Sequence, residues 1–180
     1  MRDRVGRFVI AWRTRVVVPH IRGRLLDIGC GLNELVGAYA GEGTGVDVYQ
    51  WGDVDVVVDN TADLPFEDKE FDTVAIVAAL NHIPNRAEAL AEFCRVLKPG
   101  GRIIVTMITA PVGKAWHFAR RYSDADQVER GMKPGELHGL SRGEVRRLLK
   151  QAGFGISSEQ RFMLGFNLMT IATKPAERLV

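Results

Sequence analysis

The feature that most constrains the fold of this 180-residue chain is an alternation of short, β-rich apolar runs with longer stretches of helical period. Such alternation predicts a parallel sheet with helices on both of its faces. Several of the apolar runs are nearly continuous in Val, Ile, Leu and Ala, as in strands that are covered on both sides. The predicted strands are Arg24–Ile28, Thr44–Val48, Val54–Val58, Asp72–Ala79 and Arg102–Ile108.

The last two apolar runs, Ile156–Leu164 and Asn167–Lys174, are separated only by Gly165 and Phe166. So short a link requires an antiparallel hairpin, because a parallel return needs a crossover of about a dozen residues or more. The predicted fold class is therefore α/β: a doubly wound, mostly parallel seven-stranded sheet with a C-terminal antiparallel hairpin. Since the sequence contains no linker or internal repeat, residues 1–180 are expected to form a single domain.

Two sequence patterns predict where helices begin. Asn85 followed by Glu88 resembles a capping box at the start of an amphipathic stripe. Ser141 followed by Glu144 has the same pattern. The first of these helices is expected to end at Lys98-Pro99-Gly100-Gly101, because Pro cannot continue a helix.

Composition excludes several classes of protein. Cys30 and Cys94 are the only cysteines, too few and too far apart for a disulfide framework or a four-ligand zinc site. No stretch is both long and apolar enough to cross a bilayer. These features predict a cytoplasmic protein in a reducing compartment. The Asp and His residues between Thr109 and Gly139 lack a recognisable metal-ligand spacing, so no metal site is predicted.

The first 24 residues contain seven arginines and one acid, Asp3, although the net charge of the whole chain is only +2. Apolar residues recur there at helical spacing, which predicts a basic amphipathic helix within residues 1–23. These apolar residues are Val5, Phe8, Val9, Trp12 and Val16. Two interpretations stay open: a helix that packs on the domain with a solvated basic face, or a surface for anionic lipid, nucleic acid or an acidic substrate.

A glycine-rich turn follows the first predicted strand. Gly29-Cys30-Gly31 precedes a helix, so a ligand could approach bare backbone there and meet the N–H groups of the helix N-terminus. A tight structural turn would show the same tripeptide. Asp47, eighteen residues after Gly29, ends the next strand, where a carboxylate can accept both hydroxyls of a ribose. Together the two features predict a nucleoside cofactor.

Glu34 distinguishes between two such cofactors. It stands where dinucleotide-binding enzymes carry the third glycine of their fingerprint, and its carboxylate would repel a pyrophosphate. S-adenosyl-L-methionine has no phosphate and carries a sulfonium and an ammonium group. Asp27 and Glu34 are therefore compatible with its methionine end.

Five motifs occur in order between Leu25 and Met107: LLDIGCG, GVD, ADLPFEDKEFDTV, ALNHIP and RVLKPGGRIIVTM. They resemble the ordered motifs of class I S-adenosylmethionine-dependent methyltransferases, most closely the branch with a methyltransferase type 11 domain that includes the quinone-biosynthesis enzymes. HGLSRGEVRRLLKQAGF extends the resemblance to Phe154. The resemblance implies a Rossmann-like methyltransferase fold, S-adenosyl-L-methionine as cofactor and methyl transfer as the activity.

The resemblance also implies a set of cofactor contacts. Gly29 and Gly31 would border the methionine moiety, and Asp27 would lie near its amino group. Asp47 would bind the ribose, and the segment 61–62 would offer backbone contacts to the base. The full expected set is Asp27, Ile28, Gly29, Cys30, Gly31, Asn33, Asp47, Val48, Asn60, Thr61, Ala62, Asp63, Ala79 and Leu80.

Two positions depart from the family pattern. Asn33 replaces the third glycine, and because Asn tolerates the left-handed conformation better than most side chains, the turn is expected to persist. Asn60 stands where the family usually places an acid for the adenine amine. Asp59, Asn60 and Asp63 therefore stay open as alternatives for that contact.

His82 follows the fourth predicted strand, and in open α/β sheets ligands lie beyond the carboxyl ends of the strands. This position predicts that His82 lies near the methyl acceptor, where it could act as a general base. The alternative is a loop histidine that caps backbone or contacts the cofactor. Because methyl transfer is a direct displacement with a good leaving group, alignment alone could supply much of the rate.

Residues 109–139 form a longer connection than a crossover needs, which predicts a lid or substrate insertion. Its notable side chains are Trp116, His117, Arg120, Arg121, Tyr122, Asp124, Asp126, Met132 and His138. The expected acceptor is a small molecule or a lipid-like compound. The sequence from Asn81 to Pro84 is not the Asn/Asp-Pro-Pro-Tyr/Phe motif of nucleic-acid amino methylation, and no Pro-Cys dipeptide is present, so a nucleic-acid substrate is disfavoured.

Peripheral membrane contact through the basic helix is a further prediction. Because few residues precede the first strand to cover the cleft, we also expect either an open cleft or one that the second subunit of a homodimer completes. Two rival functions remain at this point: a nicotinamide-dependent oxidoreductase and a non-catalytic module that keeps the methyltransferase fold.

Overall fold

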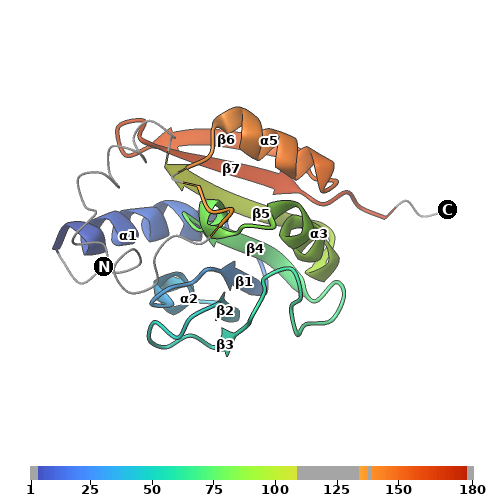
Figure 1. Ribbon diagram of the computed structural model, residues 1–180, viewed down its shortest axis with the longest axis horizontal. Helices are drawn as coiled ribbons and strands as arrows, with labels where there is room; N and C mark the ends of the chain where they lie inside the picture. Colours follow the sequence, from blue (N-terminus) through green and yellow to red (C-terminus); the bar gives the residue numbers. More distant parts are fainter. Residues whose placement is uncertain (1–3, 109–133, 138, 178–180) are drawn as a thin grey trace.

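The computed structural model describes residues 4–108, 134–137 and 139–177 (Figure 1). Most of the predicted lid, with all nine of its notable side chains, lies outside these residues. The helical elements are α1 (Arg4–Val17), η1 (Val18–His20), α2 (Glu34–Ala38), η2 (Leu80–His82), α3 (Arg86–Val96) and α5 (Arg142–Gln151). The strands are β1 (Leu25–Ile28), β2 (Gly43–Asp47), β3 (Val56–Val57), β4 (Phe71–Val77), β5 (Leu97–Ile108), β6 (Gly155–Phe162) and β7 (Asn167–Thr173).

The described strands form one seven-stranded sheet in the order β3-β2-β1-β4-β5-β7-β6, which confirms the predicted fold class. The first five strands of this order run parallel to their neighbours. β7 is antiparallel to both β5 and β6, as predicted for the last two apolar runs. All the parallel strands therefore end at the same edge of the sheet, and loops from distant parts of the sequence meet there.

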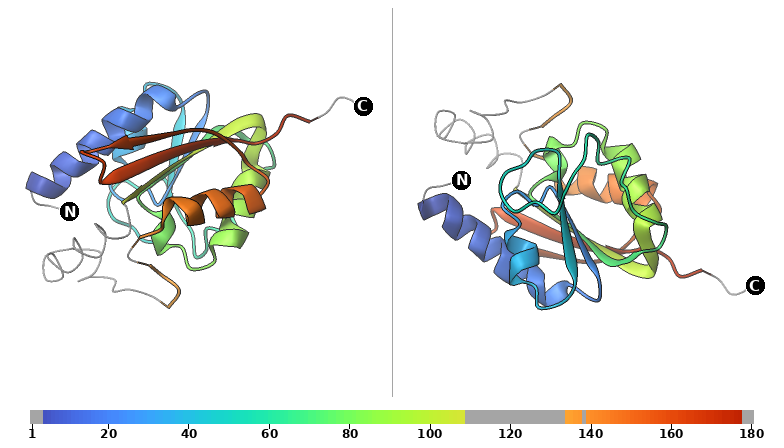
Figure 2. Two further views of the ribbon diagram at one scale, coloured as in Figure 1. Left: turned by 90° about the horizontal axis from the view of Figure 1, so that it is seen from above. Right: turned by 90° about the horizontal axis from the view of Figure 1, so that it is seen from below.

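Helices cover both faces of this sheet (Figure 2). On one face, α3 and α5 contribute Leu90, Phe93 and Leu149 to the larger core cluster. On the other face, Val17 of α1 and Leu35 of α2 pack against the second cluster. Both clusters bury side chains of β1, β4 and β5, which explains why these strands read as nearly continuous apolar runs. In the described part of the chain, no helix combines the length and apolarity needed to cross a membrane.

The strands differ from the sequence prediction at one or both ends, most clearly at β3 and β5. β3 has only two residues, Val56–Val57, because Asp55 turns its carboxylate onto the backbone N–H of Gly45 at 2.7 Å. β5 starts at Leu97, directly after α3, and its pairing with β4 shifts register between Phe71 and Thr73. The Lys98–Gly101 segment ends the helix as predicted, but it also forms the irregular first part of β5.

One of the two predicted capping boxes is confirmed and the other is wrong. Ser141 Oγ accepts from Glu144 N at 3.2 Å, and Glu144 Oε2 accepts from Ser141 N at 2.7 Å. Asn85 makes no capping bond to α3. Its amide Nδ2 instead donates to Asn60 Oδ1 at 3.1 Å, so a long-range contact replaces the local one.

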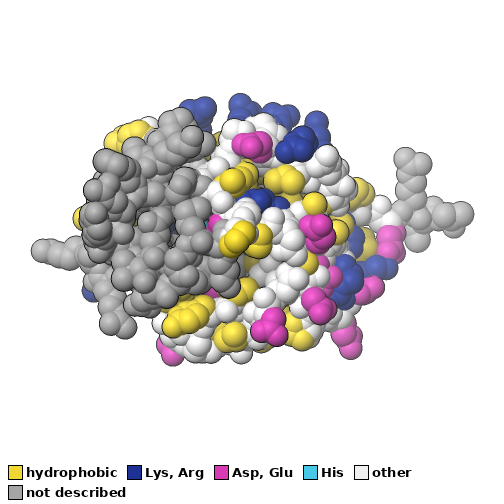
Figure 3. Space-filling model, viewed as in Figure 1, with side chains coloured by type: hydrophobic (Ala, Val, Ile, Leu, Met, Phe, Trp, Pro, Cys, Tyr) yellow, Lys and Arg dark blue, Asp and Glu magenta, His cyan; other side chains and the backbone are white. Residues whose placement is uncertain are grey.

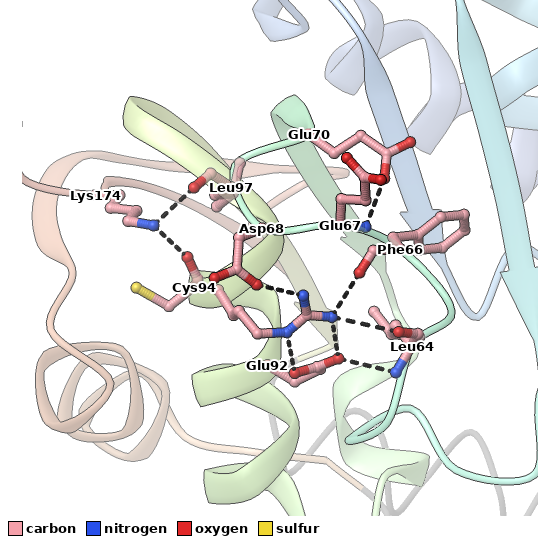
Figure 4. A network of polar contacts seen from close by, with 10 residues as sticks. Leu64, Phe66, Glu67, Asp68, Glu70, Glu92, Cys94, Leu97 and Lys174 are labelled. Atoms are coloured by element: carbon pink, nitrogen blue, oxygen red, sulfur yellow. Dashed lines mark hydrogen bonds and ion pairs between the residues drawn. The ribbon is translucent and has the colours of Figure 1, made fainter.

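The loop from Leu64 to Glu70 is fixed to α3 by one arginine (Figure 4). The guanidinium of Arg95 bonds both carboxylate oxygens of Glu92, at 2.8 and 2.7 Å, and Asp68 Oδ1 at 2.6 Å. The same guanidinium donates to the carbonyls of Leu64 and Phe66. Glu92 in turn accepts from Leu64 N at 2.8 Å. This network holds the chain immediately after residues 60–63, the segment predicted to meet the adenine.

Candidate functional site

The predicted site residues follow three neighbouring strands at their carboxyl ends. Ile28 of β1 is in register with Val46 of β2, and Asp27 is in register with Ala75 of β4. The loops after these strands therefore start side by side. The site is built from the glycine turn, the end of β2 and the segment after β4.

The glycine turn uses positive φ at three positions. Gly29 has φ +70° and Gly31 has φ +57°, and Asn33 has φ 60° in the left-handed region, which confirms the conformation predicted for Asn33. A Cβ on Gly29 would lie 2.5 Å from Ala79 Cβ, whereas a Cβ on Gly31 would meet nothing within 4 Å. Gly29 thus lets the turn pack on the segment after β4, and Gly31 leaves open space.

Asn33 has a structural role in this turn. Its amide Nδ2 donates to Asp53 O at 2.7 Å and to Asp55 Oδ2 at 3.0 Å, which ties the turn to the loop between β2 and β3. The neighbouring position 45 requires glycine, since a Cβ added to Gly45 would lie 2.0 Å from Asn33 Oδ1. The helix that follows, α2, has only five residues.

Asp47 is buried and held by backbone donors. Its Oδ2 accepts from Gly31 N at 2.9 Å, and its Oδ1 accepts from Val48 N at 2.7 Å. The carboxylate is therefore fixed in direct contact with the glycine turn before any ligand arrives. Such a fixed acceptor loses little entropy on binding a hydroxyl pair.

Asp27 is 2% exposed, and its Oδ1 has no hydrogen-bond partner among the described residues. Burial, and then the nearby charge of Asp47, raise the pKa of Asp27 to about 8. A buried oxygen left unpaired is costly, and such groups concentrate where a ligand supplies the missing partner. An ammonium group would supply both the donor and the opposite charge, so this residue fits the amino end of S-adenosyl-L-methionine.

Ile28, Leu80 and Cys30 are three more of the predicted cofactor contacts. The side chains of Ile28 and Leu80 are fully buried in the larger core cluster. Burial, followed by the charges of Asp27 and Asp47, raises the pKa of the Cys30 thiol. A thiol that is held protonated in this way is a weak nucleophile.

The segment predicted to meet the base is a compact turn. Asn60 Oδ1 accepts from Ala62 N at 3.0 Å, and Asn60 O accepts from Asp63 N at 3.1 Å. The Ala62 N–H, expected to be offered to the base, is thus used within the turn. Asp59 and Asp63 are exposed, and Thr61 is buried.

His82 lies in η2, after β4, and faces an acid that sequence reasoning missed. Its Nδ1 is 3.4 Å from Oε2 of Glu136, whose side chain is 1% exposed. Glu136 is held in place by its neighbours: Leu137 N donates to Asn81 O at 2.9 Å, and Arg86 Nη2 donates to Gly135 O at 2.7 Å. No local motif marks Glu136, because its partner lies 54 positions earlier in the sequence.

Comparisons with known proteins bear on this geometry. Residues 26–105 match a family model described as a methyltransferase domain. A demethylmenaquinone methyltransferase of Staphylococcus haemolyticus is 27% identical over 198 residues, covering 91% of this chain and 82% of that protein. One of Lactiplantibacillus plantarum is 30% identical over 131 residues, covering 66% of this chain. The match spans 55% of that relative's length, so the chain covers only about half of it.

A solved structure shares the fold. The crystal structure of a SAM-dependent methyltransferase from Thermotoga maritima superposes with a TM-score of 0.72 at 20% identity. The match covers 94% of this chain and 91% of that one. At this identity the likeness concerns the fold, and it agrees with the sheet order and the antiparallel pair described above.

Proposed function

We propose that this chain is a class I S-adenosylmethionine-dependent methyltransferase that transfers the cofactor's methyl group to a lipid-like acceptor resembling a quinone precursor. The cofactor supplies a methyl group activated on a sulfonium. The observation that carries the proposal is the pair of buried carboxylates beside the glycine turn, one with an unpaired oxygen and one fixed by backbone. The acceptor class is supported by the quinone methyltransferases among the relatives.

Within this proposal each part of the site has one task. Asp27 binds the ammonium group, and Asp47 accepts the ribose hydroxyls. The backbone of the glycine turn, which includes Cys30, surrounds the rest of the nucleoside together with the backbone of Val48. The turn at residues 60–63 flanks the adenine, where exposed Asp59 and Asp63 are better placed to accept from its amine than Asn60, whose oxygen is already shared by Ala62 N and Asn85 Nδ2.

His82 is the candidate base on the acceptor side, and Glu136 is a positioning residue that holds the ring through Nδ1. A neutral imidazole whose Nδ1–H points at a carboxylate presents Nε2 as the acceptor of a proton. The proton would leave the acceptor as the methyl group arrives. Alignment alone, without proton transfer, remains the competing account. A cytoplasmic location, inferred from cysteine usage, belongs to the same proposal.

Titration calorimetry tests the cofactor assignment. S-adenosylhomocysteine is expected to bind and NAD to give no heat, since a pyrophosphate would meet Asp27, Glu34 and Asp47. Binding of NAD alone would reverse the assignment in favour of an oxidoreductase.

Turnover tests the second rival, a non-catalytic module. With demethylmenaquinone as the probe acceptor, S-adenosylhomocysteine should form only when the acceptor is present. Cofactor binding without turnover on any quinone-like acceptor would contradict the proposed acceptor class.

If His82 is a base, His82→Gln should lower kcat at least tenfold with unchanged S-adenosylhomocysteine affinity. Glu136→Gln should shift the pH profile of kcat, because it changes the group that holds the His82 ring.

A further inference from the structure

Helix α1 leaves part of its apolar stripe exposed to solvent. Its inward face carries Gly6, Arg13 and Val17, all buried, and the Arg13 guanidinium donates to Asn167 Oδ1 at 3.2 Å through Nε and Nη2. On the outward side, Phe8 is 61% exposed and Trp12 is 36% exposed. A helix that served only the core would bury its aromatic residues and expose its arginines. In α1 the reverse holds, because Phe8 and Trp12 are exposed and Arg13 is buried.

The exposed apolar residues of α1 are packed on one another and flanked by charge. The rings of Phe8 and Trp12 meet edge to face with their centroids 5.5 Å apart, and Val5 next to them is 54% exposed. Arg7 and Arg15 are exposed on the same helix. Aromatic residues between arginines are typical of helices that lie in a membrane interface.

A second element adds to this surface. The turn between β6 and β7 exposes Leu164 by 89% and Phe166 by 51%. Because Ile108 of β5 pairs with Asn167 of β7, the turn lies at the edge where the parallel strands end, which is the edge of the candidate site. Figures 1 and 2 show the turn at the same end of the molecule as the N-terminal half of α1.

The charges around these apolar residues indicate which kind of partner would bind them. Residues 4–17 and 161–167 contain no Asp or Glu, while they carry exposed Arg7, Arg15 and Arg161. Elsewhere, on the face shown in Figure 3, acidic side chains gather over the lower right and basic ones along the upper edge. A second copy of the chain, docked symmetrically on the acid-free surface, would bring arginines against arginines. An anionic bilayer is complementary both to the arginines and to the apolar residues.

We propose that Val5, Phe8, Trp12, Leu164 and Phe166, together with Arg7, Arg15 and Arg161, form a docking surface for an anionic lipid bilayer. The apolar members enter the interface and the arginines contact lipid phosphates. This places the acceptor edge of the sheet next to the bilayer, from which a lipid-like acceptor could be taken up. That last consequence rests on the proposed function, whereas the docking itself does not.

Co-sedimentation of the full chain with vesicles tests the surface. The vesicles are phosphatidylcholine alone or mixed with phosphatidylglycerol, at low and at high salt. Binding is expected only on the anionic vesicles and should weaken as salt rises. Arg7→Gln with Arg15→Gln should reduce partitioning about 25-fold at low salt, from about fivefold per arginine. Phe8→Ser with Phe166→Ser should also reduce partitioning on the anionic vesicles at low salt, because it removes the apolar insertion while the arginines stay in place.

A matched control removes the same charge elsewhere. Arg147→Gln with Lys150→Gln changes two exposed cations of α5 and should leave partitioning unchanged. A loss as large as that of the α1 variant would overturn the proposal, since any basic face would then suffice. Equal sedimentation of all variants would overturn it as well. So would a concentration-dependent dimer that the Phe8/Phe166 variant dissociates while vesicles fail to bind the wild type.

Trp12 offers a direct readout of insertion. The chain has three tryptophans, so a variant with Trp51→Phe and Trp116→Phe reports on Trp12 alone. Its emission should shift to the blue on anionic vesicles and be quenched by brominated lipid; an unchanged spectrum on sedimenting vesicles would contradict insertion. Titration with S-adenosylhomocysteine without vesicles is the independent measurement. If S-adenosylhomocysteine binds all variants while the wild type fails to bind anionic vesicles, only the docking inference is wrong and the proposed function stands.

Discussion

Asp27 combines deep burial with an oxygen that has no hydrogen-bond partner among the described residues. Under the proposed function, these two properties favour binding of the cofactor's ammonium group at a cost in stability. In the unfolded chain its carboxyl ionises near the ordinary pKa of 3.8, whereas in the folded chain its pKa is about 8. Between these values the unfolded state has lost a proton that the folded state keeps. The contribution of Asp27 to the free energy of unfolding therefore falls as pH rises from about 4 to about 8, and is constant above that.

The substitution Asp27→Asn should separate the two effects. It removes the charge without changing the shape, so the free energy of unfolding at pH 8 should rise by about 1 kcal/mol or more, as measured by urea titration. S-adenosylhomocysteine should bind at least tenfold more weakly, because its ammonium loses a charged partner. A variant that is less stable and binds normally would show that Asp27 serves the fold.

Asp47→Ala should lower the affinity for S-adenosylhomocysteine at least tenfold, as measured by titration calorimetry. Hydrogen bonds to a charged acceptor contribute about 1.5 to 3 kcal/mol each, and the ribose would lose two. The variant also frees Gly31 N and Val48 N, so the turn itself should loosen. Asp53→Ala, which removes an exposed carboxylate nearby, is the control and should bind normally. Equal affinity of both variants would remove Asp47 from the site.

Substitutions at Gly29 and at Gly31 form a matched pair that tests the packing of the glycine turn. Both have positive φ, so alanine at either position should cost about 1 to 2 kcal/mol in backbone strain. Only at Gly29 does the new Cβ also meet Ala79, at 2.5 Å. Gly29→Ala should therefore lower the midpoint of thermal unfolding more than Gly31→Ala, and Gly29→Val more again. The reverse order would mean that the segment after β4 moves aside freely.

At the scale of the elements, only one of the two predicted capping boxes forms and can stabilise its helix. Ser141→Ala breaks a reciprocal capping box and should cost about 1 kcal/mol of unfolding free energy in urea titration. Ser158→Ala, an exposed serine on β6, is the control and should have little effect. A loss no larger than that of the control would mean that α5 is held by Val145 and Leu149 alone.

Local patterns predicted the elements well and their long-range partners poorly. The mostly parallel sheet, the antiparallel pair and the conformation of Asn33 could be inferred because each follows from patterns within short segments of the sequence. The Asn85 cap could not, since its amide binds Asn60, 25 positions away. Glu136 was missed for the same reason. The roles of Asp27 and Asp47 in cofactor binding stay predictions, although the structure brings both to the glycine turn.

At the scale of the whole molecule, the parallel strands and the C-terminal pair place several loops at one edge. Residues from the ends of β1, β2 and β4 meet there, together with the segment around Glu136 and the turn between β6 and β7. The predicted homodimer would cover this edge with a second copy, and light scattering checks it. A monomer at all accessible concentrations would leave the edge open to the bilayer or to solvent.

The order of strands also affects how the chain is made. β7 lies between β5 and β6 in the sheet, although it follows both in the sequence. While a ribosome is still synthesising the protein, the outer edge of β5 therefore has no neighbour, and β6 has emerged without a strand to join. The nascent chain carries an open, apolar sheet edge on β5 until residues 167–173 have left the exit tunnel, so chaperone protection matters most between the emergence of β5 and that of β7.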